Sequence, residues 1–159
     1  MARQKTSDDY LEALRKLKNA GLEKARYINE THTPYETLPS LEERVRDIFH
    51  IVNRSQRPIG NMLFFIMYDI ESNKVRYNVA KYLIKKGCSR IQKSIFLADL
   101  DRDTYLTIKD DLTEIQSLYD NHDSIIVCPV STDIISNMKV IGKKIDIDII
   151  THSKNTLFF

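Results

Sequence analysis

Apolar residues follow two different periods along the second part of the chain. Residues 62–68 are apolar throughout, which is typical of a strand covered on both faces. Residues 145–149 alternate Ile and Asp, the pattern of a strand with one wet face. Two stretches have helical spacing instead: Val75, Val79, Tyr82 and Leu83, then Tyr105, Ile108, Leu112, Ile115 and Tyr119. The pattern predicts strands that alternate with helices.

Residue types at the ends of these stretches set their limits. Ser72 is a good N-cap and Gly87 occupies a C′ position, while Asp101 or Asp103 caps the second helix. Strands are predicted over 90–97 and 124–130, where Pro129 favours an edge or a strand end, and a short strand over 138–141. The order predicts an α+β, ferredoxin-like (βαββαβ) domain with an extra C-terminal strand. Because its helices cover one face, we expect a second copy on the other face, and hence a homodimer.

The first sixty residues have a different character. A helix is predicted from Ser7 or Asp8 towards Ile28, and a second helix begins at Ser40, which has capping-box spacing to Glu43. Residues 55–60 read as a linker, so we predict a two-helix N-terminal extension over 1–60 and a domain over 61–159. Two short helices cannot bury their own apolar stripes. They either cap their own domain or form an arm that binds a partner or a second copy.

Charge is segregated, although the net charge of the 159 residues is only +2. Seven cations and no acid lie between Lys74 and Lys93, whereas eight acids and two cations lie between Asp99 and Asp123. The basic run is either a solvated face or a stripe that follows a nucleic-acid backbone. Under the second interpretation the DNA-binding candidates are Lys74, Arg76, Lys81, Arg90, Lys93, Lys143 and Lys144.

Asp69 is the strongest single candidate for chemistry. It directly follows the apolar strand, where a carboxylate can help to hold Mg²⁺. One carboxylate is a poor metal site, so two copies of Asp69 would have to share an ion across a two-fold axis; the alternative is a turn-forming Asp. No zinc-ligand spacing, catalytic triad or Gly-rich phosphate loop is present. Two cysteines and no long apolar stretch predict a cytoplasmic protein without membrane contact.

Several of these residues together resemble a known family. Tyr68-Asp69-Ile70, Lys74-Val75-Arg76, Gly87 and Arg90-Ile91-Gln92-Lys93-Ser94-Ile95-Phe96 are similar to CRISPR-associated protein two, the Cas-two family. The resemblance covers residues 62–142, so the N-terminal residues are an addition to the family pattern. Many members have an acid after the Phe, where this chain has Leu97.

The resemblance implies a function in CRISPR adaptation. The family forms homodimers that bind a protospacer DNA duplex and bridge dimers of the Cas-one integrase, and residues 145–149 would join the partner's sheet. Family members are also described as Mg²⁺-dependent endonucleases on RNA or double-stranded DNA, which maps the metal carboxylate to Asp69 and phosphate contacts to Lys74 and Arg76. We therefore expect an adaptor first. The alternatives are a nuclease acting through paired Asp69 residues and a toxin-like ribonuclease.

Overall fold

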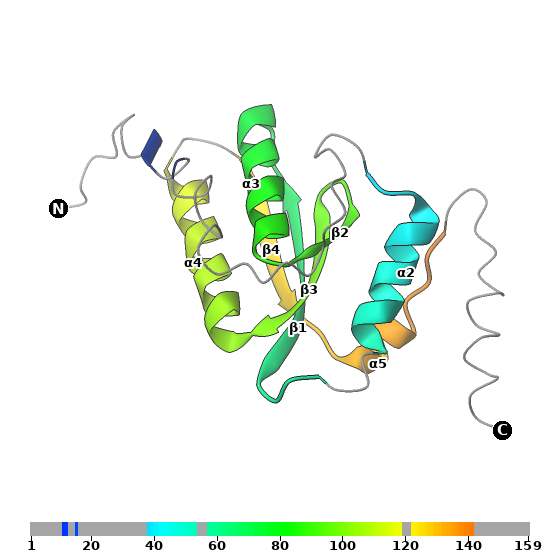
Figure 1. The fold of residues 1–159 in the computed structure, drawn as a ribbon. Coiled ribbons are helices and arrows are strands. Elements are labelled where there is room, and N and C mark those ends of the chain that lie inside the picture. Colours follow the sequence, from blue (N-terminus) through cyan, green and yellow to red (C-terminus); the bar gives the residue numbers. More distant parts are fainter. Residues whose placement is uncertain (1–10, 13–14, 16–37, 54–56, 119–121, 142–159) are drawn as a thin grey trace, which may run out of the picture.

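A computed structural model describes residues 38–53, 57–118 and 122–141, together with 11, 12 and 15 (Figure 1). Its elements are α2 (Leu41–Val52), β1 (Asn61–Asp69), α3 (Asn73–Lys85), β2 (Ser89–Gln92), β3 (Ile95–Asp101), α4 (Arg102–Ser117), β4 (Ser124–Pro129) and α5 (Thr132–Ser136). The predicted βαββαβ order is therefore present from β1 to β4.

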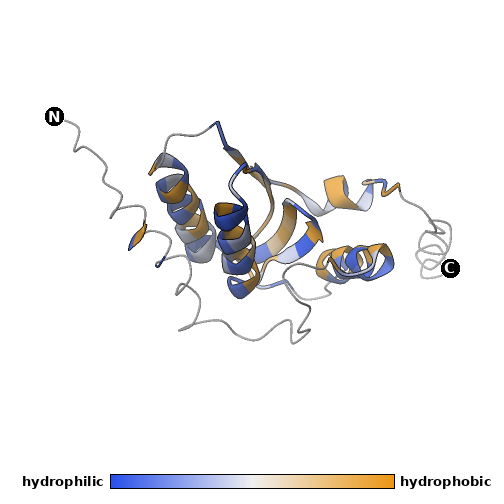
Figure 2. Cartoon of the chain, turned by 90° about the horizontal axis from the view of Figure 1, so that it is seen from above, coloured by the Kyte–Doolittle hydropathy of each residue, from blue (hydrophilic) through white to orange (hydrophobic). Residues whose placement is uncertain are grey.

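The four strands form one antiparallel sheet in the order β2-β3-β1-β4. The apolar strand β1 is central, and its Phe64 lies opposite Ala98 of β3 and Pro129 of β4. β4 is an edge strand and Pro129 is its last residue, as predicted. Helices α3 and α4 lie side by side on one face of the sheet (Figures 1 and 2). This arrangement confirms the ferredoxin-like fold.

The main core lies between this face and the two helices. Phe64, Ile66 and Tyr68 of β1 point into it because alternate side chains of a strand point to opposite faces. Phe64 also meets Tyr105 of α4 edge-on, with 4.9 Å between ring centroids. The helices contribute buried residues at the predicted spacing: Val75, Val79, Tyr82, Leu83, Ile108, Leu112 and Ile115.

The opposite face of β1 is partly covered by the chain itself. A second cluster joins Leu63 and Leu97 of the sheet to Ile48 of α2 and Ile135 of α5. Figure 2 shows the sheet between α3 and α4 on one side and α2 on the other. The prediction that the second face of β1 is covered is confirmed for Leu63, which α2 and α5 help to cover. A second copy on the rest of this face stays a prediction. An amphipathic helix near its own domain buries its apolar stripe on the nearest apolar surface.

Local signals at the helix ends work as predicted. The backbone N–H of Glu43 donates to Ser40 Oγ over 3.2 Å, and Glu43 Oε2 accepts from the Ser40 N–H over 2.9 Å, which completes the capping box. Ser72 caps α3 and Asp101 caps α4. Gly87 has φ of 93°, the left-handed conformation that favours glycine directly after a helix.

Two predictions about the strands are corrected. Residues 90–97 form a hairpin and not one strand, because β2 and β3 are separated by a turn at Lys93 and Ser94. Residues 138–141 form no strand. They follow the unpredicted helix α5, whose N-cap Ser131 accepts from the Ile134 N–H and whose end Asn137 closes by a side-chain bond to the Asp133 carbonyl.

Other predictions lie outside the described residues. These are the greater part of the helix over 7–28, the strand over 145–149, and the side chains of Lys143 and Lys144. The division into 1–60 and 61–159 stays a prediction. Within the described part, α2 belongs to the first segment and packs against the sheet of the second.

Candidate nucleic-acid interface

Helix α3 presents a stripe of lysines. Lys81 and Lys85 lie within about 20° of Lys74 around the helix axis, and the three span about 16 Å along it. This α3 lysine stripe is opposite the buried face that holds Val79. The stripe holds one aromatic contact, with Lys81 Nζ 5.9 Å from the centroid of the Tyr77 ring. It is therefore a line of point charges on the outer side of the domain.

A second cationic group lies at the end of β1. Arg76 turns away from the stripe: its guanidinium donates to the Ile70 carbonyl over 3.4 Å and also contacts Asn73. Arg90 Nη2 donates to the Lys93 carbonyl over 2.7 Å. The Tyr68 hydroxyl donates to the same carbonyl over 3.5 Å. The motif residues Tyr68, Arg90 and Lys93 thus meet at one carbonyl.

This cluster shapes the chemistry of Tyr68. Burial raises the pKa of the Tyr68 hydroxyl to about 12, while the charges of Arg90 and Arg76 oppose that rise. The phenol is therefore protonated at neutral pH and acts as a hydrogen-bond donor. Its ring stacks on Phe96, with centroids 6.1 Å apart.

Arg90 also has an evident role inside the domain. Its guanidinium lies 5.8 Å from the centroid of the Phe96 ring and bonds across the β2–β3 turn. It holds the turn at Lys93 and Ser94, where the sequence predicted continuous strand. Contact of Arg90 or Lys93 with DNA stays a prediction.

Asp69 is placed differently from the cations. It is the last residue of β1, is exposed, and lies opposite Ser124 of β4. Strand alternation puts it on the same face as Phe65 and Met67. Helix α3, which carries the lysine stripe on its outer side, covers the other face. The predicted carboxylate and the predicted DNA-binding stripe therefore belong to opposite layers.

A metal site at Asp69 is incomplete in one chain. Among the described residues, no three Asp, Glu, His or Cys side chains are grouped as metal ligands. The buried Asp123 carboxylate is already used, because its Oδ1 accepts from the Glu71 backbone N–H over 2.8 Å. Leu97, which follows Phe96 in the resemblance motif, is fully buried in the second cluster and offers no ligand. Only a second copy could bring another Asp69.

The neighbouring helix α4 limits the basic surface. Its exposed residues include the acids Asp103, Asp110 and Glu114, and the cations Arg102 and Lys109. Since α3 and α4 lie side by side (Figure 2), the α3 lysine stripe is flanked by negative charge. These charges would attract a nucleic-acid backbone along α3 and repel it beside α4.

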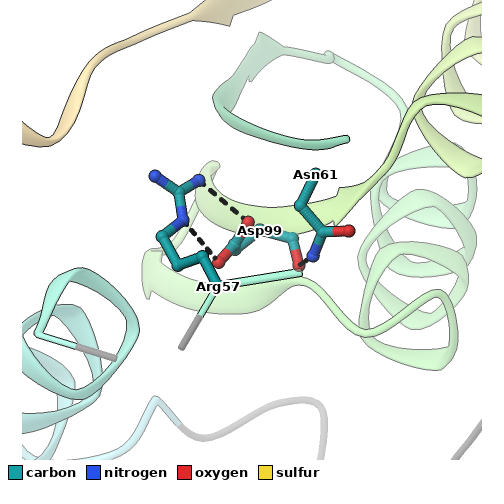
Figure 3. A network of polar contacts seen from close by, with 3 residues as sticks. All are labelled: Arg57, Asn61 and Asp99. Carbon is teal, nitrogen blue, oxygen red and sulfur yellow. Dashed lines mark hydrogen bonds and ion pairs between the residues drawn. The ribbon is translucent and has the colours of Figure 1, made fainter. Parts of the chain in front are cut away.

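A partly buried ion pair connects the linker to the sheet. Arg57 Nε and Nη2 bond to the two carboxylate oxygens of Asp99 over 3.0 and 2.9 Å, and Asn61 Nδ2 donates to the Asp99 carbonyl (Figure 3). The Asp99 side chain is only 3% exposed. The sequence analysis missed this contact, because forty-two positions separate its two partners and neither stands in a recognisable motif.

The fold and its basic helix define a ferredoxin-like α+β domain with one cationic layer. The family model of CRISPR associated protein Cas2 matches residues 62–138, from β1 to just beyond α5. Residues 62–138 are therefore similar to the Cas2 family, the Cas-two of the sequence resemblance, and the match supports a CRISPR-associated role. The match begins after α2. The search of curated proteins finds no match.

The helices of the described segments were also compared with the needs of a bilayer. None of them combines the length and the apolar character that crossing a membrane requires.

Proposed function

We propose that the protein is a homodimeric adaptor of CRISPR adaptation, which binds protospacer duplex DNA and bridges Cas-one integrase dimers. The observation that carries the proposal is the α3 lysine stripe on the outer face of a domain similar to the Cas2 family. Lysines spaced along one side of a helix can follow a phosphate backbone without reading bases. The adaptor holds the duplex, and the partner integrase performs the chemistry.

The composition of the stripe favours double-stranded DNA over single strands. Single-strand binders stack successive bases on aromatic side chains. The stripe contains a single exposed aromatic residue, Tyr77, which is paired with Lys81. Rigid duplex backbone fits such a line of charges better than unstacked bases do.

Catalysis by this chain is less well supported. Mg²⁺-dependent phosphodiester cleavage needs ligands that position the ion and the attacking water. One exposed carboxylate, Asp69, does not provide them within a single chain. The nuclease and the toxin-like ribonuclease therefore remain second to the adaptor, and Mg²⁺ at a dimer two-fold belongs to those alternatives.

Two copies are part of the proposal. The sheet face around Asp69 keeps apolar residues that the chain does not fully cover: Met67 is half-buried, and Ile126 on the edge strand β4 is 56% exposed. Surface of this kind favours association with another protein chain. Residues 145–149 would add to the partner's sheet, as the family resemblance implies.

The adaptor function is tested by reversing charge on α3. Lys74→Glu with Lys81→Glu should weaken duplex binding on the order of tenfold to a hundredfold, and lower the salt-dependence slope by about two. The matched control is Arg102→Glu with Lys109→Glu on α4, which makes the same change in net charge where the surface is already acidic. Fluorescence anisotropy with a labelled duplex, between about 50 and 200 mM salt, measures both quantities.

Two results would contradict the assignment. An α3 variant that binds duplex like the wild type would exclude the lysine stripe as the phosphate track. Equal losses in the α3 and α4 variants would mean that net charge, and not this surface, sets affinity. Capture of a Cas-one integrase by the α3 variant separates the DNA-binding from the bridging part of the function.

A further inference from the structure

Helix α2 lies outside the family match, yet it is built into the domain. Val45 and Ile48 are each 3% exposed, and Ile48 joins the second cluster with Leu63, Ile91 and Leu97. Arg44 Nη1 donates to the Ile91 carbonyl over 2.7 Å. These contacts place α2 over β2 and β3, on the face that carries Asp69.

The cover is only partial. Phe65 and Met67 on β1 and Ile95 on β3 stay half-buried, and Ile126 on β4 is exposed on the same face, since it lies opposite Met67. A groove of about 300 Å³ lies between this part of the sheet, α2 and the segment of residues 138–141. We call Phe65, Met67, Ile95 and Ile126 the open strip. The open strip contains no charged residue.

A second sheet on this face would need the layer that α2 occupies. Sheets that pack face to face lie about 10 Å apart, and a helix with its side chains is about 10–12 Å across. Over the parts of β2 and β3 that α2 covers, at Ile91 and Leu97, the two arrangements are therefore mutually exclusive. Over the open strip they are compatible.

Two features of the face favour a second copy as its occupant. Asp69 lies at the rim of the open strip as half of a candidate metal site, which only another Asp69 can complete. The strip also continues to β4, whose Ser124–Cys128 segment carries no charged side chain that a second sheet would have to bury.

We propose that α2 masks part of the surface on which a second copy binds, so that docking of α2 and back-to-back pairing of two sheets compete over β2 and β3. The inference rests on the proposed homodimeric function and adds its regulation by the N-terminal extension. With α2 docked, contact between copies is confined to the open strip. With α2 released, Leu63, Ile91 and Leu97 join the contact.

The test weakens α2 docking in the full-length chain. Ile48→Asp removes a buried contact of α2, and His50→Asp makes the same charge change on an exposed α2 position. The dimer dissociation constant is measured by analytical ultracentrifugation. If the unmasked state is a minor population, Ile48→Asp lowers this constant by about tenfold, because the competent state becomes the main one.

A second variant shows which surface associates. Ile126→Asp, combined with Ile48→Asp, places a charge in the open strip and should return the chain to monomer. Association that survives this change would overturn the proposal, because it would arise from another surface. Circular dichroism checks folding, and if Ile48→Asp does not fold, Arg44→Ala tests the same docking with a smaller decrease expected.

The remaining outcomes separate this inference from the proposed function. A wild-type dimer whose dissociation constant is unchanged or raised by Ile48→Asp overturns masking and leaves the homodimeric adaptor intact. Monomers in every variant overturn both. Masking is supported if Ile48→Asp lowers the dimer dissociation constant while His50→Asp leaves it at the wild-type value.

Discussion

A phenol and a carboxylate meet in the seam between α3 and α4. Tyr82 Oη donates to Asp111 Oδ2 over 2.6 Å, and both residues are buried. Burial raises the pKa of the Tyr82 hydroxyl far above its ordinary value, and the hydrogen bond to the Asp111 carboxylate raises it further. The short bond joins the basic helix to the acidic one at the centre of the helix layer.

Removing this donor should destabilise the domain. Tyr82→Phe leaves a buried carboxylate oxygen without one partner, which costs about 1–3 kcal/mol of unfolding free energy. Tyr77→Phe on the same helix removes a hydroxyl from an exposed residue and should change stability by less than about 0.5 kcal/mol. Urea unfolding followed by circular dichroism compares the two. Equal stabilities would mean that the bond contributes nothing beyond packing.

Single residues also show where sequence reasoning stops. Asp69 was placed correctly at the end of a buried strand, because an apolar run followed by an acid is a local signal. The partners of Asp99 and Asp111 were not predicted, because their contacts with Arg57 and Tyr82 depend on how distant segments meet. Arg90 was assigned to DNA from charge alone, and its bonds across the turn emerge only with the hairpin.

Elements were predictable in proportion to how local their signals are. The starts of α2, α3 and α4 follow from capping residues, and the end of α3 follows from Gly87. The turn that splits 90–97 and the absence of a strand over 138–141 depend on pairing with other strands. Alternation of residue types cannot reveal which strands are available to pair.

Asp101 gives a test at the level of one helix. Its carboxylate accepts from the Thr104 N–H and hydroxyl, each over 2.8 Å, and these bonds hold the pKa of Asp101 below its ordinary value of 3.8. A lowered folded-state pKa means that the stabilisation is present above the unfolded-state value and is lost as pH falls through the folded-state value. We expect Asp101→Ala to cost about 1 kcal/mol at neutral pH.

The pH dependence distinguishes a charged cap from a merely polar one. Asp101→Asn keeps a side-chain oxygen at the N-cap and should cost only a few tenths of a kcal/mol, about the strength of one exposed charge–dipole interaction. The difference in stability between wild type and Asp101→Asn should disappear below pH 3.8, where the Asp101 carboxyl becomes protonated. Thermal melts at neutral and acid pH measure it, and a difference that persists in acid would refute the electrostatic explanation.

At the scale of the molecule, the sequence predicted a sheet covered on both faces but not what covers it. The apolar run of β1 requires packing on both faces, but it does not indicate which segment or chain packs there. Of the two interpretations of the extension, a cap on its own domain agrees with the docking of α2. This distinction depends on tertiary packing, which the amphipathic pattern of α2 alone does not contain.

Asp69 tests adaptor against nuclease in the whole assembly. Asp69→Asn keeps the size of the side chain and removes its charge, so duplex binding and spacer acquisition should stay within about twofold of wild type. Any Mg²⁺-dependent cleavage of labelled RNA or duplex DNA should be lost, as it is with EDTA. Asp110→Asn on exposed α4 is the control. Loss of acquisition by a correctly folded Asp69→Asn dimer would contradict the adaptor function.

The Arg57–Asp99 ion pair bears on how far α2 can travel. It fastens the chain to β3 only four residues beyond Asn53, the C-cap of α2, and four residues span about 14 Å at most. An undocked α2 is therefore held by this short tether close to its own binding surface. Short tethers hold a ligand at an effective concentration in the millimolar range. A second copy must therefore compete with an α2 that stays close to the sheet even when it is undocked.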